Sequence, residues 1–204
     1  MKEFQITSGK IVASDPAYSI PTWCQGIIEN VKNGTWVVIP DKHDVRGWGE
    51  RVCKLTVTHK DFNFDNFVSE ELPFVGGVDS GQFGFFDYDL YRNDESAKDL
   101  EKYNFGDDFE RESGDIWYRA VCHLTLSSDH WGVLPNGAVS SSGIGDGSYP
   151  VYGIKDKDGQ YIGFQVIFID EDTNEEDEWE ECSNCGTHLN YDGSCDNCDI
   201  DDVE

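Results

Sequence analysis

Four cysteines toward the C-terminal end of this 204-residue sequence have the spacing of a metal site. They form two CxxC pairs, Cys182 with Cys185 and Cys195 with Cys198, and nine residues separate the pairs. Each pair of thiolates can supply half of a tetrahedral zinc site, and four sulfurs leave no position open for a substrate. The spacing therefore predicts one structural zinc ion bound by these four side chains.

A segment as short as residues 182–204 cannot bury a hydrophobic core, so it needs the metal to hold its shape. The alternative is two disulfide bonds, which a reducing compartment disfavours. The segment resembles the short zinc ribbons that are appended to many bacterial and phage proteins. That resemblance implies metal binding, but it does not imply a particular function.

The chain is strongly acidic, with 41 acidic residues against 15 basic ones and a net charge of -26. Residues 170–204 contain 15 of the acidic residues and neither lysine nor arginine. Such a charge opposes nucleic-acid binding, because proteins attract phosphate groups through lysine and arginine. The acidity serves solubility alone, or it attracts a protein with a basic surface, for instance by imitating a nucleic-acid backbone.

The remaining composition indicates a cytoplasmic protein. No run of 18 apolar residues is present, so we expect no membrane-spanning helix. Residues 1–6 lack the apolar centre of a secretory signal, so we expect no cleaved signal peptide. Three further cysteines, Cys24, Cys53 and Cys122, are scattered along the chain, and unpaired thiols of this kind are typical of a reducing compartment.

Strand signals dominate residues 1–169. Asn-Gly and Asp-Gly pairs favour the positive φ angles of tight hairpin turns. Three such pairs stand between apolar segments, namely Asn33-Gly34, Asn136-Gly137 and Asp158-Gly159. Residues 51–59 and 116–126 alternate with period two, so we predict a strand for each, with Val52 and Leu55 or their neighbours on a buried face. These signals predict a mainly β fold with antiparallel sheets, either a sandwich or a partly open barrel.

Helix signals are few, and residues 94–102 are the best candidate because they begin with an acidic cap and lack glycine and proline. We predict three parts: a β-rich domain at 1–169, an acidic linker at 170–181, and the zinc ribbon with an acidic tail at 182–204. The linker is predicted because its like charges repel one another. Five tryptophans in the predicted strand regions are expected in the core: Trp23, Trp36, Trp48, Trp117 and Trp131.

Three loops of the β-rich domain, at residues 8–16, 78–87 and 140–150, place carboxylates beside glycines and small hydroxyls. If they converge, their aspartates can hold a magnesium or calcium ion, or bind a sugar or a nucleotide base. The candidate ligand-binding residues are Asp15, Asp79, Ser80, Gln82, Asp87, Ser142, Gly143, Asp146 and Tyr149.

A structural interpretation of these loops remains open. Aspartates in Asp-Pro and Asp-Gly turns usually bond their own backbone, and a buried glutamine such as Gln82 can satisfy backbone groups where sheets meet. Ser80 does not lie in a nucleophile elbow, because its sequence GVDSG is one residue out of phase. Cys122 and His123 are neighbours on a predicted strand and would point to opposite faces. We therefore predict no catalytic residue.

Three motifs carry a resemblance to a known family. They are SGK followed by DP near the start, VDSGQ at 78–82, and SGIGDGSYPVY at 142–152. Together they resemble the bacterial and phage family catalogued as domain of unknown function 4241, over about residues 8–169. The resemblance implies a shared fold and a shared use of these loops, without an activity, and the zinc ribbon is an addition to the family pattern. Its occurrence in phages implies interference with a host protein as a role.

We therefore predict an accessory protein that contains structural zinc and binds a basic protein partner, without being an enzyme. The rival hypothesis is a receptor for a small ligand or nucleotide, or an enzyme, that uses the three loops. A third hypothesis is nucleic-acid binding through the ribbon, which the charge disfavours.

Overall fold

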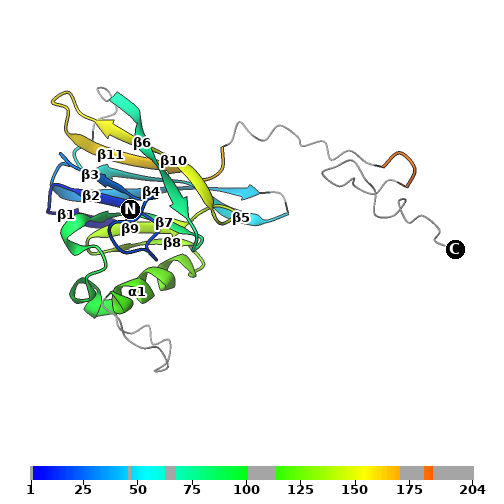
Figure 1. The fold of residues 1–204 in the computed structure, drawn as a ribbon, viewed down its shortest axis with the longest axis horizontal. Helices are drawn as coiled ribbons and strands as arrows, with labels where there is room; N and C mark the ends of the chain where they lie inside the picture. The colour runs from blue at the N-terminus through cyan, green and yellow to red at the C-terminus, as the bar shows by residue number, and fades with distance from the viewer. Residues whose placement is uncertain (1, 46, 63–67, 101–113, 171–181, 186–204) are drawn as a thin grey trace. The chain divides into compact units, whose positions relative to one another are not determined.

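Eleven β-strands form two antiparallel sheets in the computed structural model, which describes residues 2–45, 47–62, 68–100, 114–170 and 182–185 (Figure 1). The strands are β1 (Glu3–Ile6), β2 (Ile11–Ser14), β3 (Gly26–Ile28), β4 (Gly34–Val45), β5 (Gly49–His59), β6 (Val68–Val78), β7 (Gln82–Asp87), β8 (Trp131–Leu134), β9 (Gly137–Ser141), β10 (Gly147–Lys155) and β11 (Tyr161–Ile167). The larger sheet has the order β1-β4-β5-β11-β10-β6, and the smaller has the order β3-β2-β7-β9-β8. The chain divides into two compact units, Met1–Ile169 and Asp170–Glu204.

The two sheets face each other across one hydrophobic core. Phe164 of the larger sheet stacks against Trp36 of the same sheet, with ring centroids 5.8 Å apart, and against Phe85 of the smaller sheet at 5.7 Å. All three rings belong to one cluster of buried residues that draws on both sheets. The prediction of a mainly β, antiparallel fold is confirmed. Over the residues described, neither sheet closes into a barrel, so the arrangement is a sandwich.

The predicted strand at 51–59 is confirmed as part of β5, and a β-bulge explains its burial pattern. Val52 and Leu55 are both buried although three positions separate them. Asp41 of β4 pairs with Lys54, whereas the next residue pairs with Val52, so Cys53 is an extra residue in the ladder. The bulge shifts the alternation by one position and returns both apolar side chains to the core.

A single α-helix among the described residues, α1 (Asp115–Thr125), packs beside β8 and β9 (Figure 1). Its Trp117, Ala120 and Val121 form a second core with Phe86 and Val139 of the smaller sheet. The 3₁₀ helices η1 (Tyr88–Leu90) and η2 (Asp94–Leu100) precede it in the chain. The smaller sheet is therefore apolar on both faces, one against the larger sheet and one against α1.

The prediction of a strand at 116–126 was wrong, because these residues form α1. Trp117, Ala120, Val121 and Leu124 recur at intervals of three and four residues, which is the period of an amphipathic helix. The same segment also alternates with period two, so the pattern alone fits both structures. The prediction of a helix at 94–102 is met by the shorter η2, and residues 101–102 lie outside the described residues.

Two of the three predicted hairpins are confirmed and one was wrong. The turns at Asn136-Gly137 and Asp158-Gly159 connect β8 to β9 and β10 to β11. At Asn33-Gly34, however, the chain passes from the smaller sheet to the larger one, because β3 pairs with β2 whereas β4 pairs with β1 and β5. An Asn-Gly pair therefore does not specify that the flanking strands share a sheet.

The prediction of core positions for five tryptophans was confirmed for some and wrong for others. Trp36 and Trp117 are in the core as predicted, and Trp131 is half-buried beside it. The prediction of core positions was wrong for Trp23, whose surface is 85% exposed, and for Trp48, which is 56% exposed. Trp48 lies at the turn between β4 and β5, and Trp23 lies in the loop before β3.

In the ranges that the structure describes, no helix has the length and apolarity needed to cross a membrane.

The burial of the tryptophans gives a matched test of the core. We expect Trp36→Ala to lower the free energy of unfolding by about 3–5 kcal/mol, because a fully buried aromatic ring is removed and a cavity remains. The control Trp48→Ala removes the same atoms from an exposed turn and should change stability by less than about 0.5 kcal/mol. Urea unfolding followed by circular dichroism measures both. Equal losses in the two variants would contradict the assigned core.

Candidate functional site

Asp15 joins two of the predicted loops through a fully buried carboxylate. Its Oδ2 accepts the backbone N–H groups of Asp79 at 2.9 Å and Ser80 at 2.8 Å. Its Oδ1 accepts the Ser80 hydroxyl at 2.7 Å and the backbone N–H of Ala17 at 2.8 Å. Four donors therefore satisfy the buried charge, and the loop after β6 is held against the loop after β2.

The third loop joins the same cluster through Gly81. The Oδ1 of Asp146 accepts the Gly81 N–H at 2.9 Å, and the N–H of Ser142 donates to the Gly81 carbonyl at 3.0 Å. The phenol of Tyr149 and the hydroxyl of Ser142 each donate to the Gly145 carbonyl at 2.7 Å. Burial, followed by the nearby Asp146 carboxylate, raises the pKa of Tyr149, so this phenol remains a donor. The three loops therefore converge.

At Gly143, both the backbone conformation and the packing require glycine. Its φ is +66°, which other residues rarely adopt, and it is packed against the chain that follows β11. A Cβ placed there would lie 3.0 Å from side-chain atoms of both Phe168 and Ile169. Glycine at this position allows the third loop to turn tightly against the sandwich.

Gln82 connects the loop cluster to α1. Its Oε1 accepts the hydroxyl of Thr125 at 2.9 Å, and its Nε2 lies 3.3 Å from the phenol oxygen of Tyr118 and 3.4 Å from the Ser80 hydroxyl oxygen. The Sγ of Cys122 lies 3.8 Å from the same nitrogen. These partners occupy the amide, which therefore fixes the helix relative to the loops.

Asp87 does not join the cluster. It lies at the far end of β7 from Gln82, about 17 Å away at the usual rise per residue of a strand. Its buried carboxylate accepts the N–H groups of Thr7, Ser8 and Asp89, so it fixes the turn after β1.

The aspartates of the converging loops differ in what remains available to a ligand. Asp15 and Asp146 bond backbone N–H groups, which supports the structural interpretation for both. Within the described part of the chain, no group of three His, Cys, Asp or Glu residues is arranged to hold a metal ion. Asp79 is different: it is exposed, and among the described residues its carboxylate accepts one hydrogen bond, from the phenol of Tyr18 at 2.8 Å from Oδ2.

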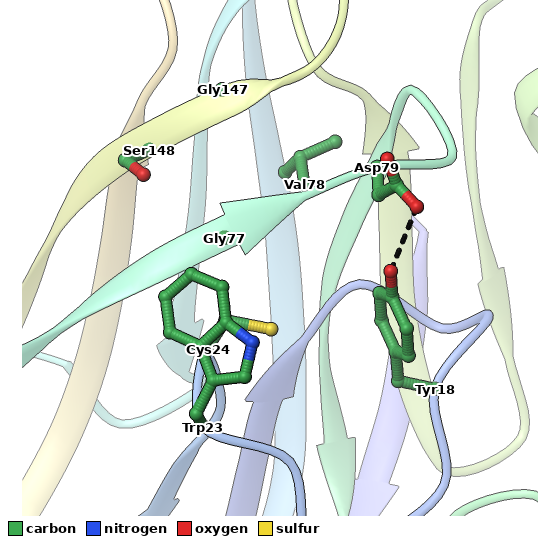
Figure 2. Close-up of a pocket in the computed structure, with 8 residues that line it drawn as sticks. All are labelled: Tyr18, Trp23, Cys24, Gly77, Val78, Asp79, Gly147 and Ser148. Carbon is green, nitrogen blue, oxygen red and sulfur yellow. Dashed lines mark hydrogen bonds between the residues drawn. The ribbon is translucent and has the colours of Figure 1, made fainter.

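A cavity of about 350 Å³ lies beside Asp79 (Figure 2). Its lining residues are Tyr18, Trp23, Cys24, Gly77, Val78, Asp79, Gly147 and Ser148. Its floor is the ladder between β6 and β10, in which Gly77 pairs with Ser148 and Val78 with Gly147. Its wall is the loop that carries Tyr18, Trp23 and Cys24. We refer to this cavity as the Trp23 pocket.

The wall of the Trp23 pocket is held at both ends. Near its start, the phenol of Tyr91 donates to the Tyr18 carbonyl at 2.6 Å. The Arg92 guanidinium donates to the carbonyls of Pro16 and Ala17, which precede Tyr18. At its end, the N–H of Gly77 donates to the Cys24 carbonyl at 3.2 Å. A Cβ at Gly77 would lie 2.5 Å from the Cys24 Cβ, so glycine allows the wall to approach the floor.

The described lining of the pocket contains a single carboxylate, that of Asp79. None of the described lining residues is a lysine, an arginine or a histidine. The hydrogen bond to Asp79 raises the pKa of Tyr18 to about 12, and burial raises the pKa of the Cys24 thiol. Both groups therefore stay protonated, so the pocket can attract a cation, and Cys24 is not activated as a nucleophile.

Sequence reasoning identified Asp79 and missed the rest of the pocket lining. Tyr18 follows the Asp15-Pro16 turn, and Trp23 stands in a segment with Ser19, Pro21 and Thr22 that has no strand alternation. That absence of alternation was the available sign that Trp23 is not a core residue. Cys24, Gly77 and Ser148 carried no sequence signal, because the β6–β10 register brings them together.

Comparison with known families gives one result. Residues 55–166 match the model of a family described as "Protein of unknown function (DUF4241)". The match contains the second and third loops, and it begins in β5 and ends in β11. No curated protein and no solved structure matches the chain.

Because Asp15 holds two loops together, we expect its substitution by asparagine to lower stability strongly. Asp15→Asn places an NH₂ group against backbone donors inside the protein, so we expect the free energy of unfolding to fall by about 2–4 kcal/mol. The control Asp146→Asn alters an exposed residue with one loop bond, and should lower it by less than about 1 kcal/mol. Urea unfolding at neutral pH measures both. A loss for Asp15→Asn no larger than that of the control would contradict the organising role.

Proposed function

Because the chain belongs to the DUF4241 family, whose description names no activity, we propose from its geometry that it binds a protein with a basic surface. The observation that carries this proposal is the Trp23 pocket, which combines an exposed indole with a lone carboxylate and has no cationic lining residue. An exposed tryptophan beside a cavity is a feature of binding surfaces, where aromatic side chains supply much of the affinity.

The charge of the whole chain supports the same partner. A net charge of -26 attracts a basic surface over distances comparable to the screening length and repels phosphate groups. A nucleotide would bring its phosphates toward Asp79 and Asp146 without a compensating lysine or arginine in the pocket. An uncharged small ligand stacked on Trp23 is the rival, since the cavity volume lies at the lower end of the range for small-molecule sites.

We propose that the second unit, Asp170–Glu204, contains a zinc ribbon whose ligands are Cys182, Cys185, Cys195 and Cys198. The support is the spacing of the two CxxC pairs. Cys195 and Cys198 lie outside the described residues. Cys182 directly precedes a short turn at 183–185, and Cys185 is the last residue of that turn. The cytoplasm of a bacterial cell is the proposed compartment, because its reducing conditions keep thiols available to a metal. For a phage-encoded chain, the partner would be a host protein.

Elemental analysis of protein prepared without chelator tests the ribbon. We expect about one zinc ion per chain in the wild type and in the control Cys122→Ser, and none in Cys182→Ser. A chelator should remove the metal while the first unit, Met1–Ile169, still unfolds cooperatively, because that unit has its own core. Metal-free wild-type protein, or a mass that shows two disulfides, would overturn the zinc proposal.

Binding to a basic partner is tested by capture on the immobilised full chain. We expect captured proteins to be basic, and capture to weaken as salt rises from about 0.1 M to about 1 M, because the screening length falls from about 10 Å to about 3 Å. Trp23→Ala should reduce capture of the same protein several-fold, whereas the exposed-tryptophan control Trp48→Ala should not. Capture that is insensitive to both salt and Trp23→Ala would sink the proposal.

A further inference from the structure

We propose that the Trp23 pocket receives an arginine side chain of the partner, an inference that rests on the proposed function. The geometry that points to it is the position of three groups around one cavity: the Trp23 indole, the Asp79 carboxylate and the Tyr18 phenol (Figure 2). The first supplies an aromatic face, the second a negative charge, and the third fixes the orientation of that charge.

The Trp23 indole lies open to solvent at the rim of the pocket, with 85% of its surface exposed. A planar cation that stacks on an indole gains an electrostatic attraction to the ring and covers apolar surface at the same time. The backbone on both sides of the ring is restrained, because Cys24 bonds Gly77 and the Thr22 N–H donates to Gln25 at 2.8 Å. The ring is therefore presented on an ordered loop.

Asp79 is a carboxylate without a cationic partner among the described residues. Some carboxylates elsewhere in the described residues do pair with lysines, as Glu29 does with Lys10 and Glu70 with Lys155. The arginine nearest along the wall, Arg92, is already engaged, since its guanidinium bonds two carbonyls and lies over the Tyr118 ring at 5.7 Å. The pocket thus keeps one unpaired negative charge at its edge.

Tyr18 makes this carboxylate a directed acceptor. Its phenol donates to Oδ2 of Asp79 at 2.8 Å, and the raised pKa of Tyr18 keeps that proton in place at neutral pH. Oδ1 and the remaining lone pair of Oδ2 stay available to two parallel N–H donors. A guanidinium presents such a fork, whereas an ammonium presents a compact point charge that is more strongly hydrated.

The size of the cavity agrees with a single side chain. About 350 Å³ accommodates a long side chain, and two of the four floor residues, Gly77 and Gly147, have no side chain. The backbone of the β6–β10 ladder therefore lies close to whatever enters. Arginine unites the three requirements of this pocket, since it is flat, cationic and able to donate two parallel hydrogen bonds to one carboxylate.

Three small probes test the inference on the full chain: N-acetyl-arginine amide, its uncharged isostere N-acetyl-citrulline amide, and N-acetyl-lysine amide. Indole N–H resonances in NMR spectra report binding, and the Trp23 signal is identified by its loss in Trp23→Ala. We expect the arginine probe to bind at least about tenfold more tightly than citrulline and several-fold more tightly than lysine. Asp79→Asn should remove most of the difference between arginine and citrulline, while Trp48→Ala leaves all three affinities unchanged.

Equal binding of the arginine and citrulline probes would overturn the inference and favour stacking of an uncharged group on Trp23. Binding of the lysine probe as tight as that of arginine, or tighter, would overturn recognition by the two parallel N–H donors of a guanidinium. Absence of binding by all three probes would also overturn it. Failure of this inference can be distinguished from failure of the proposed function. Partner capture that depends on Trp23 without arginine binding removes the inference alone, whereas arginine binding without Trp23-dependent capture removes the protein partner and leaves the pocket chemistry standing.

Discussion

The buried carboxylate of Asp15 holds together segments of chain that lie 64 and 65 residues apart in the sequence. A buried charge is costly unless donors surround it, and here four donors do so, three of them backbone N–H groups. Those N–H groups belong to loops, where no strand ladder would otherwise satisfy them. The carboxylate and the loops therefore satisfy each other, and the position of the Asp79 backbone, and with it the edge of the Trp23 pocket, follows from this one side chain.

Hydrogen bonds to the backbone distinguish the structural aspartates of these loops from Asp79, whose carboxylate is available to a ligand. Asp15, Asp87 and Asp146 each accept at least one backbone N–H, so their charges are used in fixing loops. Asp79 contributes its N–H to this network, and its carboxylate points to Tyr18 at the cavity. Sequence composition cannot distinguish these roles, because all four residues stand beside glycine or hydroxyl side chains or at a strand end.

What the sequence predicted depended on local patterns. The hairpins at Asn136-Gly137 and Asp158-Gly159 follow from turn chemistry, and β5 follows from alternation even though a bulge interrupts it. The composition of the three loops left their convergence open, and the hydrogen bonds of Asp15 and Gly81 establish it. The passage between sheets at Asn33-Gly34 is a tertiary feature and has no local signal. The helix α1 was missed because its residues satisfy both periods, and contact with Phe86 and Val139 of the sheet selects the helix.

The acidic charge and the Trp23 pocket would act over different distances, and this difference connects them in the proposed binding to a basic protein. Residues 170–204 hold more of the net negative charge than the longer first unit does, with 15 acidic residues and no basic ones. Charge of this kind raises the rate of encounter with a basic protein and is screened within about 10 Å at moderate salt, so by itself it selects weakly among basic partners. The Trp23 pocket acts only at contact and presents one oriented carboxylate beside one indole. Under the proposed function, selection among basic proteins would depend on which of them presents an arginine that fits this pocket, and the general acidity would determine how often they meet.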